Sequence, residues 1–289
     1  MKWISDSSIL IVGLGLMGGS YARALKRLGY RVCAISRSRS TIDYALAEGL
    51  IDAGSTEADS ALIGEADAVI FALYPGVLLD WLRDNQHLLK SGALLTDVTG
   101  VKGGIVSEIQ AMLRPDLEFI ASHPMAGREV YGVRNSDDRI FHGANFLITP
   151  TARNSPEAVA WCAGLGRLLG CRKVSILSPE EHDEMIGFVS QLTHCIAVAL
   201  MTCNDNPELV NYTGDSFRDL TRIARINDEM WSELFLRNKT ALLREMDAFA
   251  GEFRALRAMI ADGDREALRE KMRLSTARRA LFDREKDGG

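Results

Sequence analysis

The sequence predicts an α/β protein in which a doubly wound, mainly parallel β-sheet is followed by an all-α C-terminal domain. Two observations support this. As far as residue 177, short apolar runs rich in β-branched residues alternate with helical patterns, which is the rhythm of βαβ units with buried strands. From Ser178 to Gly289 the pattern is helical, without a convincing strand. We therefore predict two packed domains, residues 1–177 and 178–289.

The composition limits the class of protein. The 289 residues are 47% apolar and 25% charged, as in ordinary soluble globular proteins. The net charge of −5 argues against nucleic-acid binding, and no run approaches the roughly 18 uninterrupted apolar residues of a membrane helix. The N-terminus lacks the apolar core of a signal peptide, so we expect a cytoplasmic protein that binds neither nucleic acid nor membrane. The five cysteines form no Cys-x-x-Cys pair and are expected to be free thiols, with no metal site.

The first predicted strand and the loop after it indicate a dinucleotide site. Ser8–Val12 is a short apolar run, and a helical pattern extends from Gly19 to Leu28. A Gly-x-Gly-x-x-Gly motif lies between them. Its first glycine allows a tight turn, the second lets a pyrophosphate approach the backbone, and the third lets the helix pack on the strand. This context predicts a Rossmann-type dinucleotide-binding domain; the alternative is a purely structural glycine turn. The predicted cofactor-binding residues here are Gly13, Leu14, Gly15, Leu16, Met17 and Gly18.

The end of the second predicted strand, Arg31–Ile35, bears on the choice of cofactor. An NAD site usually has an acidic residue there that binds the ribose hydroxyls. The chain instead continues Ser36-Arg37-Ser38-Arg39, which supplies guanidinium groups and hydroxyls suited to a 2′-phosphate. We therefore predict NADP, bound by Ser36, Arg37 and Ser38. The alternative is that the arginines are exposed loop charges and NAD binds without the acid.

The alternation of strands and helices continues to residue 177. Strands are predicted over 68–73, 93–97, 117–121, 145–149 and 172–177. Helices are predicted over 41–48, 77–89, 104–112 and 155–169. The turn Leu73-Tyr74-Pro75 would lie at the carboxyl edge of the sheet, so Leu73 and Tyr74 are predicted to lie beside the cofactor.

The second domain begins with a strong helix signal. Ser178 offers a capping hydroxyl, Pro179 suits the first helical position, and Glu181 stands at the capping-box site. Long helices with apolar residues on more than one side indicate burial on more than one face, so we predict a homodimer through this domain. The alternative is a monomeric helical bundle. Helices are predicted over 179–203, 217–224, 228–260 and 265–282.

Two of the five histidines are candidates for function. His123 follows the predicted strand 117–121, at the edge where open α/β sheets bind ligands, and neutral imidazole can accept a proton near pH 7. His123 is therefore the candidate catalytic base. His194 lies inside the first long helix, on the same face as Ser190 and Gln191; its alternative role is a packed core side chain. We interpret the other three, His87, His142 and His182, as surface residues.

Several further blocks occur in a fixed order between about residue 8 and about residue 260. They are the glycine motif with Gly19-Ser20, Asp97-Val98-Thr99-Gly100-Val101-Lys102, Ser122-His123-Pro124-Met125-Ala126-Gly127 with Glu129 and Gly132, Gln191-Leu192-Thr193-His194, and Asp219-Leu220-Thr221-Arg222-Ile223-Ala224 with Met230-Trp231. The glycine motif is common to many oxidoreductases, whereas the histidine–proline block followed by Thr-Arg-Ile-Ala is much more specific. In this combination the chain resembles the prephenate/arogenate dehydrogenases of tyrosine biosynthesis.

The resemblance implies an NAD(P)-dependent oxidative decarboxylation. Prephenate loses a hydride from C4 and CO2 from C1, which gives 4-hydroxyphenylpyruvate; arogenate gives tyrosine directly. His123 would accept the proton of the C4 hydroxyl as carbonyl character develops. Arg222 would clamp a substrate carboxylate and His194 would donate to another. The alternatives are a structural ion pair of Arg222 with Asp219, and a packed imidazole at His194.

The sequence also departs from the family pattern near the substrate. Gly100 stands where many members carry a serine whose hydroxyl is thought to contact the substrate, and Thr99 offers a hydroxyl one residue earlier. Thr99 is therefore a candidate contact to both substrate and cofactor. Arg128 would be a further substrate cation, or would regulate access by pairing with Glu129. Gly127 and Glu129 complete the substrate-binding residues that the resemblance implies.

Two other functions fit parts of the sequence. A β-hydroxyacid dehydrogenase would also open with Gly-Leu-Gly-x-Met-Gly, but would use a lysine of the helical domain, where Lys239 and Lys271 stand, rather than His123. A catalytically inactive dinucleotide sensor would not need His123 and Arg222. We therefore favour the prephenate dehydrogenase interpretation, with arogenate dehydrogenase as its nearest alternative.

Overall fold

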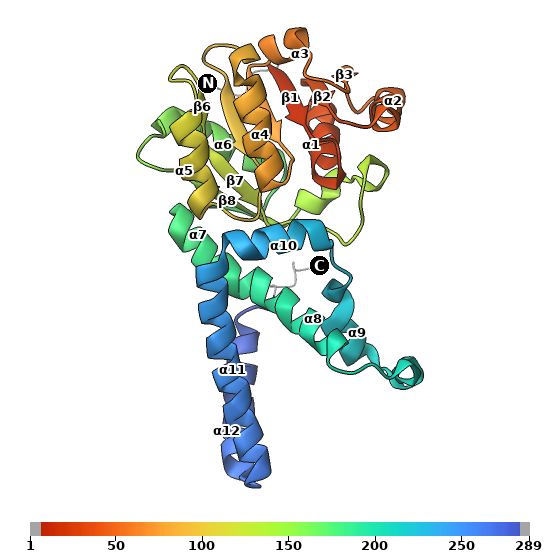
Figure 1. Ribbon diagram of the computed structural model, residues 1–289, viewed down its shortest axis with the longest axis vertical. Helices are drawn as coiled ribbons and strands as arrows, with labels where there is room; N and C mark the ends of the chain where they lie inside the picture. The colour runs from red at the N-terminus through yellow and green to blue at the C-terminus, as the bar shows by residue number, and fades with distance from the viewer. Residues whose placement is uncertain (1–6, 284–289) are drawn as a thin grey trace, which may run out of the picture. The chain divides into compact units, whose positions relative to one another are not determined.

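The computed structural model describes residues 7–283 and confirms the predicted α/β class (Figure 1). The strands of the main sheet are β1 (Ser8–Val12), β2 (Arg31–Ile35), β3 (Ala53–Ser55), β4 (Ala68–Phe71), β5 (Leu94–Asp97) and β6 (Glu118–Phe119). All six are parallel, in the order β3-β2-β1-β4-β5-β6. The order runs outward in opposite directions from β1 and β4. The topological switch point, where such sheets bind ligands, therefore lies between these two strands.

Helices cover both faces of the main sheet. Side chains of β1 alternate between two cores, with Ile9 and Ile11 in one and Leu10 and Val12 in the other. The first core includes residues of α1 (Leu16–Arg27), α2 (Arg39–Ala47) and α6 (Pro156–Leu168). The second includes residues of α3 (Ser60–Gly64), α4 (Pro75–Asn85) and α5 (Gly103–Met112). In Figure 1, α4 and α5 lie in front of the sheet.

His123 lies in a second sheet, which differs from the prediction. This sheet contains β7 (Ala121–Pro124), β8 (Asn145–Thr149) and β9 (Lys173–Ile176), with β7 antiparallel to β8 and β8 parallel to β9. We expected the strand at 117–121 to place His123 at the edge of the main sheet, but the chain leaves that sheet after β6. The cause lies at the end of β5. There the Ser122 N–H donates to Asp97 Oδ1 at 3.0 Å, and the Ser122 hydroxyl donates to the Asp97 carbonyl oxygen at 2.9 Å. Hydrogen bonds of side chains thus take the place of backbone pairing between the strands at this point.

The chain after β9 is helical among the described residues. It contains α7 (Pro179–Ile186), α8 (Thr193–Thr202), α9 (Asp215–Thr221), α10 (Asp228–Arg237), α11 (Lys239–Ala261) and α12 (Arg265–Ala280). Ser178 starts α7 through a capping box with Glu181, as predicted. The helix predicted over 179–203 contains a π-helical segment, Gly187–Leu192, and such wide turns are frequent at functional sites.

The helix predicted over 228–260 is interrupted at Asn238. This residue ends α10 with φ −106° and ψ 26°, outside the helical region, and is buried. Its side-chain amide donates to the Asp183 carbonyl oxygen and to Gln191 Oε1, both at 2.8 Å. A buried amide needs such partners, so its tertiary hydrogen bonds prevail over the helical pattern.

By compactness the chain forms two units, Met1–Lys239 and Thr240–Gly289. The first unit holds both sheets and the helices through α10. The second holds most of α11 together with α12, joined by an ion pair between Lys271 and Glu252. The domain boundary predicted at residue 177 lies inside the first unit and stays a prediction.

Among residues 7–283, one helical stretch is long and apolar enough, by length and composition, to cross a membrane. It is Pro179–Thr202, in which an 18-residue window has a mean hydropathy of 1.6, and 28% of that window is buried. The expectation that no uninterrupted apolar run approaches 18 residues concerns a different limit, because polar side chains such as Ser190, Gln191 and His194 interrupt this stretch. A single such stretch is weak evidence for a membrane, because core helices of soluble proteins meet the same criterion. The stretch leaves Phe188, Val189 and Met201 exposed.

Candidate active site

The glycine loop has the geometry that its motif predicts. Gly13 adopts φ +95°, and a Cβ there would overlap the Ala72 carbonyl oxygen. A Cβ on Gly18 would overlap the Gly13 carbonyl oxygen, so this glycine allows α1 to pack closely. A Cβ on Gly15 would have no heavy atom within 4 Å, and Gly15 starts α1 without a side-chain cap. The open approach and the uncapped amides suit a pyrophosphate, so the loop fits a dinucleotide.

Three predicted site segments line the same edge of the sheet. The glycine loop follows β1, the Leu73-Tyr74 turn follows β4, and Gly100 follows β5; these strands are neighbours. Tyr74 starts α4, and its hydroxyl oxygen lies 2.9 Å from Asn227 Nδ2 at the start of α10. The Gly76 N–H donates to Glu233 Oε1 of α10 at 2.7 Å. Helix α10 is thereby attached to the carboxyl edge of the sheet.

The segment after β2 contains one arginine, Arg37, that forms no ion pair with another described residue. The Ser38 hydroxyl caps α2 by accepting from the Thr41 N–H at 3.3 Å, and Arg39 pairs with Asp43 at 2.9 Å. Arg37 is exposed and has no ion pair with any residue in the range 7–283. Arg37 is thus the guanidinium that is free to meet a cofactor phosphate.

A buried ion pair lies beneath the site. Lys102 Nζ is 2.6 Å from Asp97 Oδ2 and 2.7 Å from the Ser122 carbonyl oxygen, and both charged side chains are buried. Burial lowers the pKa of Lys102, and Asp97 opposes that effect. The Thr99 hydroxyl contacts the Asp97 carboxylate and the Val101 carbonyl oxygen. The Thr99 hydroxyl therefore belongs to the buried network and does not contact His123.

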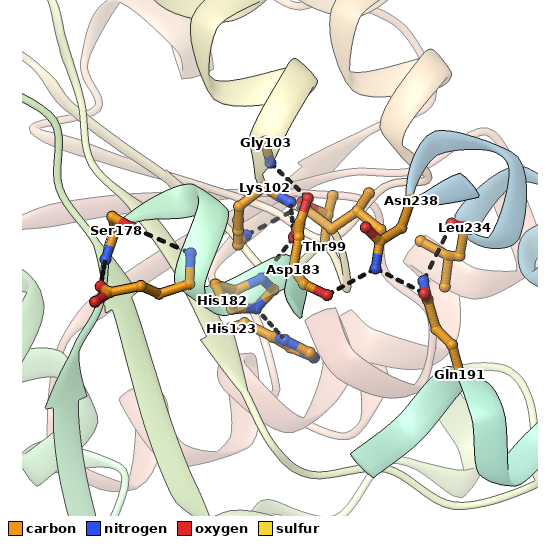
Figure 2. A network of polar contacts seen from close by, with 12 residues as sticks. Thr99, Lys102, Gly103, His123, Ser178, His182, Asp183, Gln191, Leu234 and Asn238 are labelled. Carbon is orange, nitrogen blue, oxygen red and sulfur yellow. Dashed lines mark hydrogen bonds and ion pairs between the residues drawn. The ribbon is translucent and has the colours of Figure 1, made fainter. Parts of the chain in front are cut away.

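His123 has a hydrogen-bonded neighbour that the sequence did not indicate. The His123 ring is half-buried, and His123 Nδ1 lies 2.9 Å from Nε2 of His182 (Figure 2). His182 Nδ1 in turn lies 2.8 Å from Asp183 Oδ1. Burial lowers the pKa of His123 well below 6.5, and the proximity of His182 and Lys102 lowers it further. His123 is therefore neutral at pH 7, as a proton acceptor must be.

Position 100 faces this imidazole. A Cβ on Gly100 would lie 3.5 Å from Leu234 Cδ1 and 3.9 Å from His123 Cε1. Both are ordinary contact distances, so the position has room for a side chain. The structure places no side-chain hydroxyl there, since Thr99 points into the buried network.

Glu129, His194 and Arg222 gather near one another. Arg222 Nη1 lies 2.6 Å from Glu129 Oε1, and both charges act on the pKa of His194, which burial lowers. The His194 ring stacks on Trp231 with centroids 3.7 Å apart, and Nδ1 lies 2.9 Å from the Ser190 carbonyl oxygen. A carbonyl oxygen only accepts, so Nδ1 carries the proton and Nε2 is the free nitrogen.

The remaining predicted substrate residues lie nearby in the chain but make other contacts. Arg128 donates to the Asn135 carbonyl oxygen at 2.7 Å, whereas Glu129 pairs with Arg222. The expected pairing of Arg128 with Glu129 was therefore wrong. Gly127 is exposed in the loop after β7. No group of three metal-ligating side chains occurs within residues 7–283.

Sequence reasoning missed three site residues: Lys102, His182 and Asp183. The surface interpretation of His182 was wrong, because its side chain is fully buried. A signal was present, since His182-Asp183 directly follows the capping box of a helix. Lys102 stood inside one of the blocks that carried the resemblance. Neither the capping box nor the block around Lys102 shows that His182 and Asp183 contact Lys102 and His123 in the fold.

The doubly wound sheet and its glycine loop assign the chain to the dinucleotide-binding oxidoreductases. A neutral imidazole such as His123 is the kind of group these enzymes use to take a proton from an alcohol. Family models for prephenate dehydrogenase match the chain in two parts. The nucleotide-binding domain matches residues 21–184 and the dimerization domain matches residues 178–274. The chain belongs to the prephenate dehydrogenase family.

Known proteins agree with this assignment. The chain is 32% identical to prephenate dehydrogenase of Bacillus subtilis over 278 residues, which is 93% of this chain and 74% of that protein. It superposes with a TM-score of 0.89 and 30% identity on prephenate dehydrogenase from A. aeolicus in complex with hydroxyphenyl propionate and NAD+, covering 98% of this chain and all of that one (100%). It also matches Synechocystis arogenate dehydrogenase, with a TM-score of 0.81 and 25% identity over 96% of this chain and 100% of that one. The predicted family and the predicted reaction class, an oxidoreductase that decarboxylates, are confirmed.

Proposed function

We propose that the chain catalyses the oxidative decarboxylation of prephenate to 4-hydroxyphenylpyruvate in tyrosine biosynthesis. The observation that carries the proposal is His123, a neutral and half-buried imidazole whose second nitrogen is free for a substrate hydroxyl. Arogenate is the alternative substrate, and the likeness to an arogenate dehydrogenase supports keeping it.

His123 acts as the proton acceptor in this proposal. When bound, the nicotinamide supplies the acceptor for the hydride that leaves C4. His123 takes the C4 hydroxyl proton through Nε2 while the C4–O bond becomes a carbonyl. The C1–carboxylate bond then breaks, its electron pair makes the ring aromatic, and CO2 departs. The imidazolium returns the proton to the ring oxygen, so no proton is gained or lost overall.

Arg222 and His194 are proposed to bind the two substrate carboxylates. Arg222 already holds a carboxylate, that of Glu129, and a substrate carboxylate would take its place. His194 presents Nε2, which becomes a donor to an anion once the ring is protonated. Thr99, Gly127 and Arg128 stay as predictions; the contacts of Thr99 do not favour its role.

We propose NADP as the cofactor. Arg37 supports this because it is an exposed guanidinium after β2, where an acidic residue would favour NAD. NAD is the alternative, and it is the cofactor named for the similar A. aeolicus enzyme. The glycine loop, Ser36, Ser38, Leu73 and Tyr74 are the further proposed contacts.

We also propose a homodimer through the helical part of the chain, in the cytoplasm, with no nucleic-acid or membrane partner. The family model of a dimerization domain over residues 178–274 supports the dimer. The exposed apolar side chains Phe188, Val189 and Met201 would be covered by a second copy.

A steady-state assay of the purified protein tests the proposal. Prephenate and arogenate are each offered with NADP and with NAD while the reduced-nicotinamide absorbance is followed. We expect turnover with prephenate and the higher kcat/KM with NADP. Preference for arogenate would establish the alternative substrate. No reduction with any of the four combinations would refute the dehydrogenase function.

A further inference from the structure

We propose that His182 and Asp183 are positioning residues that fix the tautomer of His123, leaving the lone pair on its Nε2. The inference deepens the proposed function and rests on it for the role of His123. It starts from the chain of contacts His123–His182–Asp183 in Figure 2.

The carboxylate of Asp183 anchors this chain. Oδ1 accepts from the Lys102 N–H at 2.8 Å, and Oδ2 accepts from the Gly103 N–H at 2.7 Å. These amides belong to the start of α5, whose dipole favours a negative charge there. The Asn238 amide holds the main chain of the same residue through its carbonyl oxygen at 2.8 Å. Asp183 is therefore fixed at both its backbone and its side chain.

The proton positions follow from donor and acceptor chemistry. Asp183 Oδ1 only accepts, so His182 Nδ1 carries a proton toward it across 2.8 Å. A neutral imidazole has one N–H, so His182 Nε2 accepts from His123 Nδ1 at 2.9 Å. The proton of neutral His123 then sits on Nδ1. Its Nε2 makes no hydrogen bond to any residue between 7 and 283 and is left to accept a proton.

The opposite arrangement is disfavoured. A proton on His182 Nε2 would leave the lone pair of its Nδ1 facing the Asp183 carboxylate at 2.8 Å. Two acceptors would then oppose each other in a buried place, which costs more than a hydrogen bond contributes. His182 is buried, and burial lowers its pKa, so the doubly protonated form is disfavoured as well.

The same chain assists His123 after it takes the proton. The imidazolium would keep its Nδ1–H bond to His182, and Asp183 would stabilise the charge through that ring. Lys102 opposes this, and Asp97 offsets Lys102. Besides the two histidines themselves, the titratable groups that act on the pair are Asp183, Lys102 and Asp97.

Nitrogen NMR of the free protein tests the tautomer without any turnover. With 15N-labelled histidine, we expect the wild-type His123 signal to show a protonated Nδ1 and an unprotonated Nε2 at pH 7.5. Asp183→Ala removes the acceptor of the His182 Nδ1 proton, so the His123 signal should move toward a mixture of the two tautomers. A wild-type His123 protonated at Nε2 would overturn the inference even if prephenate is turned over. Conversely, the NMR result stands if the assay fails.

Kinetics of position 182 test the consequence for the reaction. His182→Leu removes the acceptor and should lower kcat about 10- to 100-fold with the KM for prephenate within twofold. His182→Gln keeps an acceptor oxygen near the Nε2 position and should recover most of that loss. The control is the exposed histidine variant His87→Gln, which should match the wild type. An unchanged kcat in folded His182→Leu would contradict the role of His182; if that variant does not fold, the NMR result decides.

Discussion

Arg222 Nη1 lies 2.6 Å from Glu129 Oε1, and both side chains stay partly open to solvent, at 63% and 36% exposure. An exposed ion pair of this kind contributes about 1 kcal/mol or less. A substrate carboxylate that offers two oxygens to the guanidinium can therefore displace Glu129 at small cost. The pair with Glu129 keeps the Arg222 guanidinium oriented and leaves it available to a substrate carboxylate.

Glu129→Gln and Arg222→Gln should consequently have opposite effects on substrate binding. Release of Arg222 in Glu129→Gln should lower the KM for prephenate by up to about fivefold, because the displaced pair is worth about 1 kcal/mol or less. Loss of the guanidinium in Arg222→Gln should raise it about 10- to 100-fold. Arg218→Gln, which breaks an exposed pair with Asp215 on α9, is the matched control and should leave KM unchanged. A higher KM in Glu129→Gln would show that Glu129 itself binds substrate.

Gly100→Ser should improve the enzyme. The new Cβ fits at ordinary contact distances from Leu234 and His123, and its hydroxyl would meet the substrate hydroxyl that His123 deprotonates. One hydrogen bond of about 1 kcal/mol corresponds to a roughly fivefold higher kcat/KM. Gly100→Ala supplies the same Cβ without the hydroxyl and serves as the control. A fall in kcat/KM for Gly100→Ser alone would mean that the hydroxyl competes for His123.

Lys102→Met should be strongly destabilising. It leaves the buried Asp97 carboxylate without its cation, which costs about 3–5 kcal/mol of unfolding free energy. Urea unfolding measures the change. Lys90→Met is the comparison, because Lys90 pairs with Asp67 near the surface and should cost about 1 kcal/mol or less. The double variant Asp97→Asn with Lys102→Met should recover part of the loss; no recovery would show that Lys102 acts mainly through the Ser122 carbonyl.

Arg37→Ala should weaken NADP more than NAD. The guanidinium is free after β2 and would contact only the 2′-phosphate, so the KM for NADP should rise about 10-fold or more with that for NAD nearly constant. Arg39→Ala, which removes a cation already paired with Asp43, is the control. Equal losses for both cofactors would defeat the assignment of NADP.

Stability should fall as the pH drops below about 6.5. Burial lowers the pKa of His123 and of His182 in the folded protein, while unfolded histidines titrate near 6.5. Below that pH the unfolded chain binds protons that the folded chain refuses, so the free energy of unfolding decreases by up to about 1.4 kcal/mol per histidine per pH unit. Urea unfolding at pH 7.5, 6.5 and 5.5 measures this, and His182→Gln should show a shallower fall. A pH-independent unfolding free energy over this range would contradict the lowered pKa values.

Local sequence signals were sufficient for much of the fold. Ser8–Val12, Arg31–Ile35 and Asn145–Thr149 are strands with the predicted ends, because each is a short apolar run with polar or turn residues at its borders. The glycine loop and the Ser178 capping box are equally local, since a few neighbouring residues determine their geometry.

The features that the sequence did not reveal depend on contacts between distant segments. Strand β3 and helix α3 are too short to show a period, and β3 exists because it pairs with β2. The break at Asn238 depends on Asp183 and Gln191. His123 and Gly100 could be predicted as parts of the site, but the pairing of His123 with His182 spans 59 residues and has no local signature.

The π-helical segment Gly187–Leu192 connects two parts of the proposed active site, because His182 and Asp183 precede it and His194 follows it. Each residue of a regular helix turns by about 100°. Deleting one residue from the segment would restore regular pairing and rotate His194 by about that angle, away from Glu129 and Arg222, while His182 stayed at His123. Evolution toward a more regular and locally more stable helix would therefore separate the proposed proton acceptor from the proposed carboxylate-binding residues. Related chains that lose a residue here should need a compensating insertion before His194 to keep their activity.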